Sequence, residues 1–164
     1  MKALVTGGAG FVGSNLADRL IELGHEVVII DNLSTGKLEN INIKAEFIGK
    51  CLTSLEEDFL IGKGIDVVFH LAALARVQPS IEDPINFNEH NVTATVKLLY
   101  ACHRAKIKRV VYSASSSAYG DATEFPTPET HPINPLSPYG LQKLIGEQYC
   151  KMFSEVYGLD TVSL

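Results

Sequence analysis

The sequence predicts a doubly wound α/β fold, in which helices cover both faces of a parallel β-sheet. Two observations lead to this prediction. Short runs rich in valine and isoleucine alternate with longer helical stretches, and three glycines follow the first run at a regular spacing. The chain has 164 residues, enough for one domain with a sizeable core, so we expect residues 1–164 to form a single domain.

Six segments are predicted as strands because they are almost entirely apolar or β-branched, as strands buried on both faces of a parallel sheet are. They are residues 2–6, 26–31, 45–49, 66–72, 109–115 and 160–164. The sixth predicted strand contains the last residue of the chain, so the chain is expected to end within it.

Three longer segments are predicted as helices: residues 10–23, 85–106 and 138–156. Four apolar residues of the first helix recur at spacings of three or four and are expected to form its buried stripe. They are Val12, Leu16, Leu20 and Leu23. The segment 125–138 contains five prolines and is predicted to be a loop, since proline interrupts both helices and central strands.

Composition excludes several classes of function. The net charge of −5 gives no electrostatic reason to expect nucleic acid or an anionic membrane as a partner. No apolar run approaches the roughly 20 residues that span a bilayer, and glycines interrupt the N-terminus too early for a signal peptide. Three widely spaced cysteines, Cys51, Cys102 and Cys150, predict neither a disulfide framework nor a metal site, and they suit a reducing cytoplasm.

The glycines Gly7, Gly10 and Gly13 lie between the first predicted strand and the first helix. Such glycines permit a tight turn, a close approach of a pyrophosphate to the backbone, and close packing of helix on strand. The helix N-terminus adds free N–H groups that favour phosphates. The spacing therefore indicates a dinucleotide site, although an ordinary strand-to-helix turn would look similar.

An acidic residue ends the second predicted strand. Asp31 follows Gly13 by 18 positions, close to the ~20 expected for a carboxylate that binds the adenosine ribose hydroxyls. A carboxylate there repels a 2′-phosphate, so NAD is favoured over NADP, with Lys37 weakening that preference slightly. The alternative is that Asp31 is a turn or cap residue.

The stretch "SPYGLQK" places Tyr139 four residues before Lys143, on one face of a helix. Tyrosine normally titrates near ~10, and a nearby ammonium favours its phenolate, so the pair fits a general base. A pair on a solvated helix is the plainer alternative. Four hydroxyls precede the pair at the end of the fifth predicted strand: Ser113, Ser115, Ser116 and Ser117. One of them is a candidate ligand for a substrate oxygen.

Taken together, these motifs resemble the extended short-chain dehydrogenases/reductases, in the NAD-dependent nucleotide-sugar epimerase/dehydratase family. The matching stretches are "TGGAGFVGSNL", "DNLSTG", "VVFHLAAL", "NEHNVTAT", "SASSSAYG" and "SPYGLQK". Within the family, the sequence is most similar to UDP-hexose 4-epimerases that act on UDP-glucose and UDP-galactose or on UDP-N-acetylhexosamines. The resemblance implies a Rossmann fold, bound NAD, a UDP-hexose substrate and a homodimer formed by the two later helices.

The resemblance also implies roles for individual residues. Tyr139 would be the catalytic base, Lys143 its electrostatic partner and a ligand of the nicotinamide ribose, and Ser115 (or Ser116) the ligand of the sugar 4-oxygen. The cofactor-binding residues would be Gly7, Gly10, Phe11, Val12, Gly13, Asp31, Asn32, Ser34, Thr35, Gly36, Leu71, Ala72, Ala73, Asn91 and Ser113, together with Tyr139 and Lys143. Phe11 and Val12 would meet the pyrophosphate through their backbone.

The sequence departs from the family pattern in three places. Lys50 and Cys51 stand where an aspartate and an aliphatic residue usually frame the adenine, which predicts weaker cofactor binding. Ala75 replaces a phosphate-contacting lysine of some 4-epimerases, with Arg76 adjacent. The C-terminal substrate domain of the relatives is expected to be missing.

Two other functions remain open. A 4,6-dehydratase needs a carboxylate pair near the serines, and the first carboxylate after them is Asp121, which counts against that reaction. A non-catalytic NAD-binding module is the alternative from another class. His70, at the end of a buried strand, is predicted to be a packed core residue and not a ligand.

Overall fold

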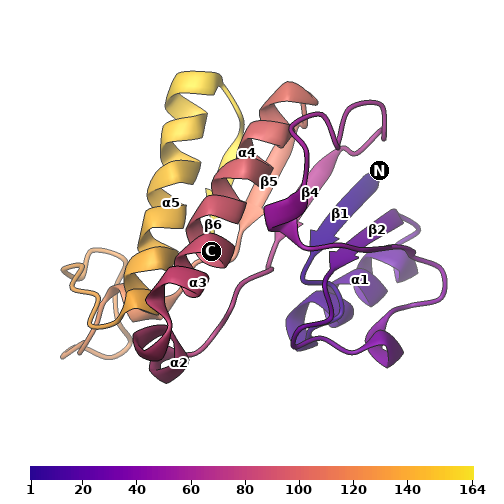
Figure 1. The fold of residues 1–164 in the computed structure, drawn as a ribbon. Helices are drawn as coiled ribbons and strands as arrows, with labels where there is room; N and C mark the ends of the chain where they lie inside the picture. The colour runs from indigo at the N-terminus through magenta and orange to yellow at the C-terminus, as the bar shows by residue number, and fades with distance from the viewer.

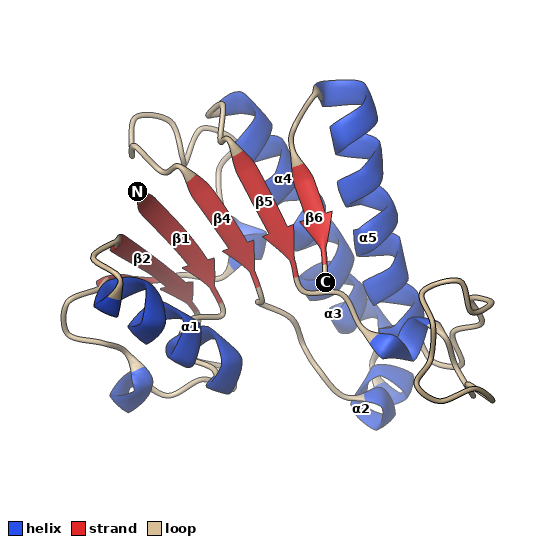
Figure 2. Ribbon diagram, turned by 180° about the vertical axis from the view of Figure 1, so that it is seen from behind, coloured by secondary structure: helices blue, strands red, loops and turns tan.

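Six parallel strands form one sheet at the centre of the molecule (Figure 1 and Figure 2). The structure is a computed structural model and describes residues 1–164. The strands are β1 (Lys2–Thr6), β2 (Glu26–Asp31), β3 (Glu46–Gly49), β4 (Val67–His70), β5 (Arg109–Tyr112) and β6 (Thr161–Ser163). Their order is β3-β2-β1-β4-β5-β6, which confirms the predicted doubly wound fold. The order reverses between β1 and β4, where such sheets open a crevice for ligands.

Helices cover both faces of the sheet. They are α1 (Phe11–Glu22), α2 (Val77–Glu82), α3 (Pro84–Asn88), a π-helical turn (Glu89–Thr93), α4 (Ala94–Arg104) and α5 (Pro138–Tyr157), and single 3₁₀ turns span Leu38–Asn40, Leu52–Ser54 and Ser116–Ala118. Figure 1 shows α4 and α5 side by side on one face, and Figure 2 shows α1 on the other face over β1 and β2. None of the helices is both long enough and apolar enough to cross a bilayer.

The core lies in two layers because successive strand residues point to opposite faces. Leu4, Val28 and Val68 lie side by side in the register and pack beneath α4 and α5. The alternate residues, such as Val5 and Ile29, pack beneath α1. Strands buried on both faces explain the nearly continuous apolar runs in the sequence.

The predicted apolar stripe of α1 is partly wrong. The side chains of Val12 and Leu23 are 61% and 56% exposed, whereas Gly13, Ala17 and Leu20 face the sheet. The reason is the close approach at Gly13, which turns the smallest residues of the helix inward. A larger side chain on that face would hold the helix away from β1.

The later segments differ from prediction mainly in their ends. The predicted helix 85–106 exists but contains the π-helical turn. The proline-rich segment is irregular up to Ser137, and Pro138 then begins α5 at a position where its missing N–H costs nothing. The predicted strands 66–72 and 109–115 end early, at His70 and Tyr112, and the chain turns from both into loops that line the site.

Candidate active site

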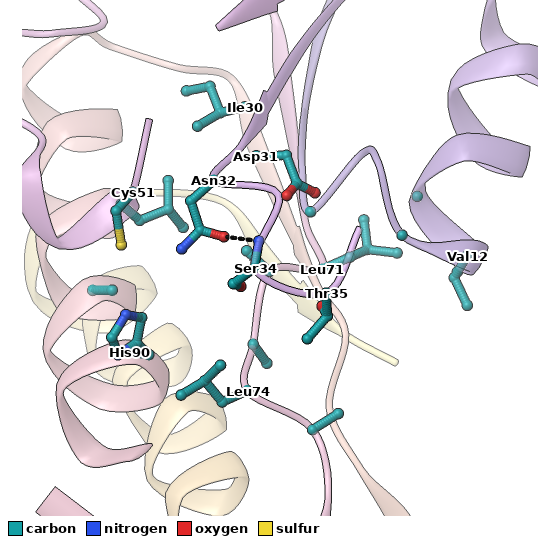
Figure 3. Close-up of a pocket in the computed structure, with 18 of the residues that line it drawn as sticks. Val12, Ile30, Asp31, Asn32, Ser34, Thr35, Cys51, Leu71, Leu74 and His90 are labelled. Atoms are coloured by element: carbon teal, nitrogen blue, oxygen red, sulfur yellow. Dashed lines mark hydrogen bonds between the residues drawn. The ribbon is translucent and has the colours of Figure 1, made fainter. Parts of the chain in front are cut away.

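A cavity of about 280 Å³ opens at the carboxyl ends of β1, β2 and β4 (Figure 3). Most of the predicted cofactor-binding residues line it: Gly7, Gly10, Phe11, Val12, Gly13, Asp31, Asn32, Ser34, Thr35, Leu71, Ala72 and Ala73. Eight further residues complete the lining: Ile30, Lys50, Cys51, Leu52, Leu74, Ala75, His90 and Ala94. No sequence motif had indicated a role for Ile30, Leu52, Leu74, His90 or Ala94.

The glycine turn brings three backbone segments into close contact. Gly7 has a φ of +70°, and a Cβ there would lie 2.8 Å from the Ala72 nitrogen. A Cβ on Gly13 would overlap the Gly7 carbonyl oxygen and lie 2.8 Å from the Gly8 Cα. The turn therefore packs directly on α1, as the glycine spacing predicted, and also on the loop after β4, which the spacing did not predict.

The first turn of α1 offers backbone N–H groups to the cavity. Its N-cap is Gly10, which provides no side-chain cap, and no acidic residue follows in the first turn. Phe11 and Val12, which are 85% and 61% exposed, line the cavity at this first turn. Uncapped N–H groups and the helix dipole favour an anion at this position.

The Asp31 carboxylate is fixed at the cavity wall by two backbone groups. Its Oδ2 accepts a hydrogen bond of 3.0 Å from the Ala9 N–H, and its Oδ1 accepts one of 2.8 Å from the Leu33 N–H. Gly36 does not line the cavity. It lies against Ala9, where a Cβ would come within 2.8 Å, and so holds the loop after β2 close to the glycine turn.

A polar row crosses the ends of three adjacent strands on the α4–α5 face. Thr6, His70 and Tyr112 are the last residues of β1, β4 and β5 and lie side by side in the register. The Thr6 Oγ1 accepts the N–H groups of Leu71 and Ala72, both at 3.2 Å. Thr6 therefore shapes the loop that lines the cavity.

The protonation of His70 follows from its partners. The Thr95 hydroxyl donates its hydrogen to the Asn91 carbonyl (2.7 Å), so the His70 Nε2–H donates to the Thr95 oxygen (2.9 Å). The His70 Nδ1 then accepts from the Thr6 hydroxyl (2.8 Å). Burial, with Lys143 nearby, lowers the pKa of His70 to about 3. His70 is thus a neutral, buried residue that links Thr6 to Thr95 by hydrogen bonds, consistent with the prediction of a packed core residue.

This neutral histidine gives the chain an acid-sensitive stability. Above pH 6.5 both states hold His70 neutral; below it the unfolded chain gains a proton that the folded chain accepts only near pH 3. We expect the His70 contribution to the free energy of unfolding to fall by about 2–3 kcal/mol between pH 7 and pH 4.5. Urea denaturation of wild type and His70→Asn at both pH values measures it.

The His70→Asn variant is expected to be less stable at pH 7, because the hydrogen bonds of the ring to Thr6 and Thr95 are lost. It is also expected to be less sensitive to acid. His131→Asn, in the proline-rich loop, serves as the matched control and keeps the wild-type dependence. An acid sensitivity of His70→Asn equal to that of wild type would contradict the assignment.

The side chain of Asn91 does not line the cavity. It is 2% exposed, and its Oδ1 accepts from the Leu74 N–H (2.8 Å) while its Nδ2 donates to the Leu74 carbonyl (3.0 Å) and to Gln142 Oε1 (3.1 Å). The amide is thus engaged with Leu74, which lines the cavity, and with α5. Its position in the π-helical turn matches the tendency of such turns to occur at functional sites.

The start of α5 fixes Tyr139 in place. Ser137 caps the helix by accepting the Gly140 N–H at 3.1 Å, and the Tyr139 N–H donates to the buried Ser80 Oγ at 3.1 Å. A Cβ on Gly140 would lie 2.6 Å from the Ser117 carbonyl oxygen, so the first turn of α5 rests on the serine turn.

Lys143 is buried without a carboxylate. The residue is 4% exposed, and none of the ion pairs of the chain includes it. Its Nζ lies 4.2 Å from the centroid of the Tyr112 ring, and the Tyr112 hydroxyl donates to the Lys143 carbonyl at 3.2 Å. Burial lowers the pKa of Lys143 to about 8. Tyr112 therefore supports both the backbone and the ammonium of this lysine.

The serine turn after β5 lies beside α5. Ser115 caps the 3₁₀ turn Ser116–Ala118, and its Oγ accepts the Ser117 N–H at 3.2 Å, which leaves its hydrogen free to donate. Ser113 is half-buried next to it, and its N–H donates to the His70 carbonyl at 3.1 Å. These serines, Tyr139 and Lys143 lie outside the cavity, on the β5–α5 side of the same sheet edge.

Such a fold and such a site define a Rossmann-type dinucleotide-binding protein. A model of the NAD dependent epimerase/dehydratase family matches residues 3–164. The chain is 44% identical over 159 residues to a putative UDP-glucose 4-epimerase of Methanocaldococcus jannaschii. The aligned region covers 96% of this chain and 52% of the relative. The chain therefore belongs to the NAD dependent epimerase/dehydratase family, and NAD is its cofactor.

Two solved structures are similar over 99% of the chain. A UDP-N-acetylglucosamine 4-epimerase from Methanobrevibacter ruminantium, in complex with UDP-N-acetylmuramic acid, has a TM-score of 0.92 at 43% identity, with 53% of its own chain covered. A UDP-glucose 4-epimerase from Thermus thermophilus in complex with NAD has a TM-score of 0.92 at 36% identity, with 54% covered. The chain thus spans about half the length of the relatives it matches.

Proposed function

We propose that this chain carries the cofactor-binding and proton-transfer half of an NAD-dependent nucleotide-sugar 4-epimerase. The substrates are UDP-glucose and UDP-galactose or the corresponding UDP-N-acetylhexosamines, since the names of similar proteins include UDP-glucose, UDP-galactose and UDP-N-acetylglucosamine. The observation that carries the proposal is the arrangement on α5. Tyr139 lies one turn before a buried, unpaired ammonium and beside the serine turn.

The proposed reaction is a transient oxidation at C4 of the sugar. Lys143 stabilises the phenolate form of Tyr139, this phenolate accepts the proton of the 4-hydroxyl, and the Ser115 hydroxyl donates to the 4-oxygen. NAD, held by the residues of the cavity, would supply the hydride chemistry at C4. Tyr139 then gives its proton back, so the protein ends unchanged.

The remaining assigned residues bind the cofactor in this proposal. The Asp31 carboxylate accepts hydrogen bonds from the adenosine ribose hydroxyls, and Asn32, Ser34 and Thr35 surround this ribose. The α1 N-terminus binds the pyrophosphate. Leu71, Ala72 and Ala73 flank the dinucleotide. Asn91 and Gly36 act through the loops they hold, and Lys143 also binds the nicotinamide ribose.

A non-catalytic NAD-binding module is the second candidate, because the cavity is lined by predicted cofactor-binding residues and by neither Tyr139 nor Lys143. A dehydratase is less well supported. The serine turn carries no carboxylate, and the first one after it is Asp121.

One experiment separates enzyme from module. The purified chain is assayed for retained NAD and for conversion of UDP-galactose to UDP-glucose. The epimerase proposal predicts conversion that is lost in Tyr139→Phe, because the proton acceptor is removed, while NAD remains bound. Tyr149→Phe, also on α5, is the matched control and keeps the wild-type rate. Retained NAD with no conversion by wild type would favour the module.

The same proposal includes a homodimer in the cytoplasm. The outer surfaces of α3 and α5 expose apolar side chains, with Ile85 84%, Leu141 48% and Val156 68% exposed, and a second copy would cover them. Sizing in solution checks the dimer. All three cysteines are free, which suits a reducing compartment.

A further inference from the structure

One end of the cavity, here called the base end, is formed by Lys50, Cys51 and Leu52 after β3 and by His90 and Ala94 on the facing helix. Figure 3 shows Cys51 and His90 together at this end, with Val12 far from both. Under the proposed function the purine lies here. The pyrophosphate belongs at the α1 N-terminus, and the Tyr139–Lys143 pair occupies the opposite half of the sheet edge.

The Cys51 carbonyl, the Cys51 Sγ and the Asn32 side-chain oxygen, all near the base end, already accept hydrogen bonds within the protein. The Cys51 carbonyl already accepts from the Ser54 N–H (3.1 Å) and the Ser54 Oγ (2.8 Å), and the Cys51 Sγ accepts from Thr53 Oγ1 (3.1 Å). The Asn32 Oδ1 accepts from the Ser34 N–H (3.0 Å), while the amide hydrogens of Asn32 donate to no other group of the protein.

Lys50 adds the strongest donor. It is exposed at the cavity rim and takes part in none of the ion pairs of the chain. Its Nζ lies 5.8 Å from the centroid of the Phe59 ring, while the Lys63 Nζ lies 4.7 Å from the same centroid. The Lys50 ammonium is therefore an uncompensated donor that shares its only aromatic neighbour with a second cation.

His90 provides the one side-chain acceptor at this end. Its ring nitrogen Nδ1 lies 2.9 Å from the Asn86 carbonyl, so Nδ1 carries the hydrogen and Nε2 of the neutral ring has a lone pair. This ring belongs to the helix, whereas Lys50 and Cys51 belong to the loop after β3. The loop side of the base end thus offers donors.

These donors distinguish between purines that carry different groups at C6. Adenine presents an amino donor at C6, whereas a 6-oxopurine presents an acceptor oxygen. An ammonium makes a charge-assisted hydrogen bond with that oxygen and none with the amino group.

We propose that Lys50 determines the base specificity of this site, so that the chain binds the hypoxanthine analogue of NAD at least as tightly as NAD. This inference rests on the proposed cofactor site. A 2′-phosphate is a different possible partner for the ammonium, but the Asp31 carboxylate at the ribose position repels it.

The test is calorimetric titration of the chain, freed of bound nucleotide, with NAD, nicotinamide hypoxanthine dinucleotide and NADP. Wild type is expected to bind the hypoxanthine form as tightly as NAD or more tightly, and NADP more weakly than either. Lys50→Asp should change the ratio of the two affinities by about tenfold in favour of NAD. Lys50→Met should weaken the hypoxanthine form alone.

Lys63→Met is the matched control, because Lys63 contacts the same phenylalanine ring but does not line the cavity. It should leave all three affinities unchanged. A wild-type preference for NAD of tenfold or more that Lys50→Met does not alter would overturn the inference, as would tightest binding of NADP. If no dinucleotide binds wild type, the proposed cofactor site itself fails.

Discussion

Gly13→Ala is expected to reduce dinucleotide affinity by about 100-fold or more and to destabilise the fold by about 2 kcal/mol. The added methyl group would overlap the Gly7 carbonyl oxygen and lie 2.8 Å from the Gly8 Cα and 2.9 Å from the Gly7 carbonyl carbon. These neighbours are backbone atoms, so relief requires α1 to move away from the turn. Overpacking costs about 1–3 kcal/mol, which outweighs the gain of up to ~1 kcal/mol from replacing a helical glycine.

The affinity falls because the displaced helix no longer presents its first N–H groups together with the turn. Titration with NAD and urea denaturation measure the two effects. Gly24→Ala is the matched control. Gly24 has a φ of +80° with open space around it, so alanine there adds backbone strain of about 1 kcal/mol and leaves dinucleotide affinity intact. Wild-type affinity in Gly13→Ala would refute the account of the turn.

Lys143→Met is expected to stabilise the chain by about 2 kcal/mol at pH 7. Burial lowers the pKa of Lys143 from an ordinary 10.5 to about 8, so the folded state carries a charge at a cost of about 3 kcal/mol. The contact of the ammonium with the Tyr112 ring, worth about 1 kcal/mol, is lost in the variant. The methionine side chain keeps the apolar packing of the lysine stem.

The pH dependence has a definite sign. Below pH 8 both states are protonated and the folded state bears the full cost. Between about pH 8 and 10.5 the folded state releases the proton first, so wild-type stability rises and the advantage of the variant shrinks. Denaturation at pH 7 and pH 9.5 measures this. Lys151→Met, on the exposed side of α5, should change stability by less than ~0.5 kcal/mol at both values. A destabilised Lys143→Met, or an advantage independent of pH, would contradict the prediction.

Much of the fold follows from local patterns. The first two strands match their predicted bounds because apolar runs end at Thr6 and Asp31, polar residues at the sheet edge. The glycine spacing and Asp31 located the cavity, since both depend on short-range geometry. The apolar spacing in α1 gave a partly wrong buried face, because the close approach of the helix at Gly13 decides which face turns inward and the spacing does not show this approach.

The rest of the site depends on long-range contacts that no local pattern contains. Thr6 meets His70, 64 residues away, and Tyr112 meets the Lys143 carbonyl, 31 residues away. The available signal was weak: each of these strands ends in a polar or hydroxyl-bearing residue. Nothing in the sequence indicated that the Asn91 side chain would form hydrogen bonds with Leu74 and Gln142.

That buried amide of Asn91 joins segments 17 and 51 residues away, one in the cavity wall and one in the helix that bears the tyrosine and lysine. The two parts cannot drift apart without breaking a hydrogen bond shielded from water, which is costly. In the proposed reaction the sugar loses a proton from its 4-hydroxyl and a hydride from C4. The proton acceptor lies on α5, and the hydride acceptor would be bound in the cavity. Their separation is therefore set when the polypeptide folds, before any sugar arrives.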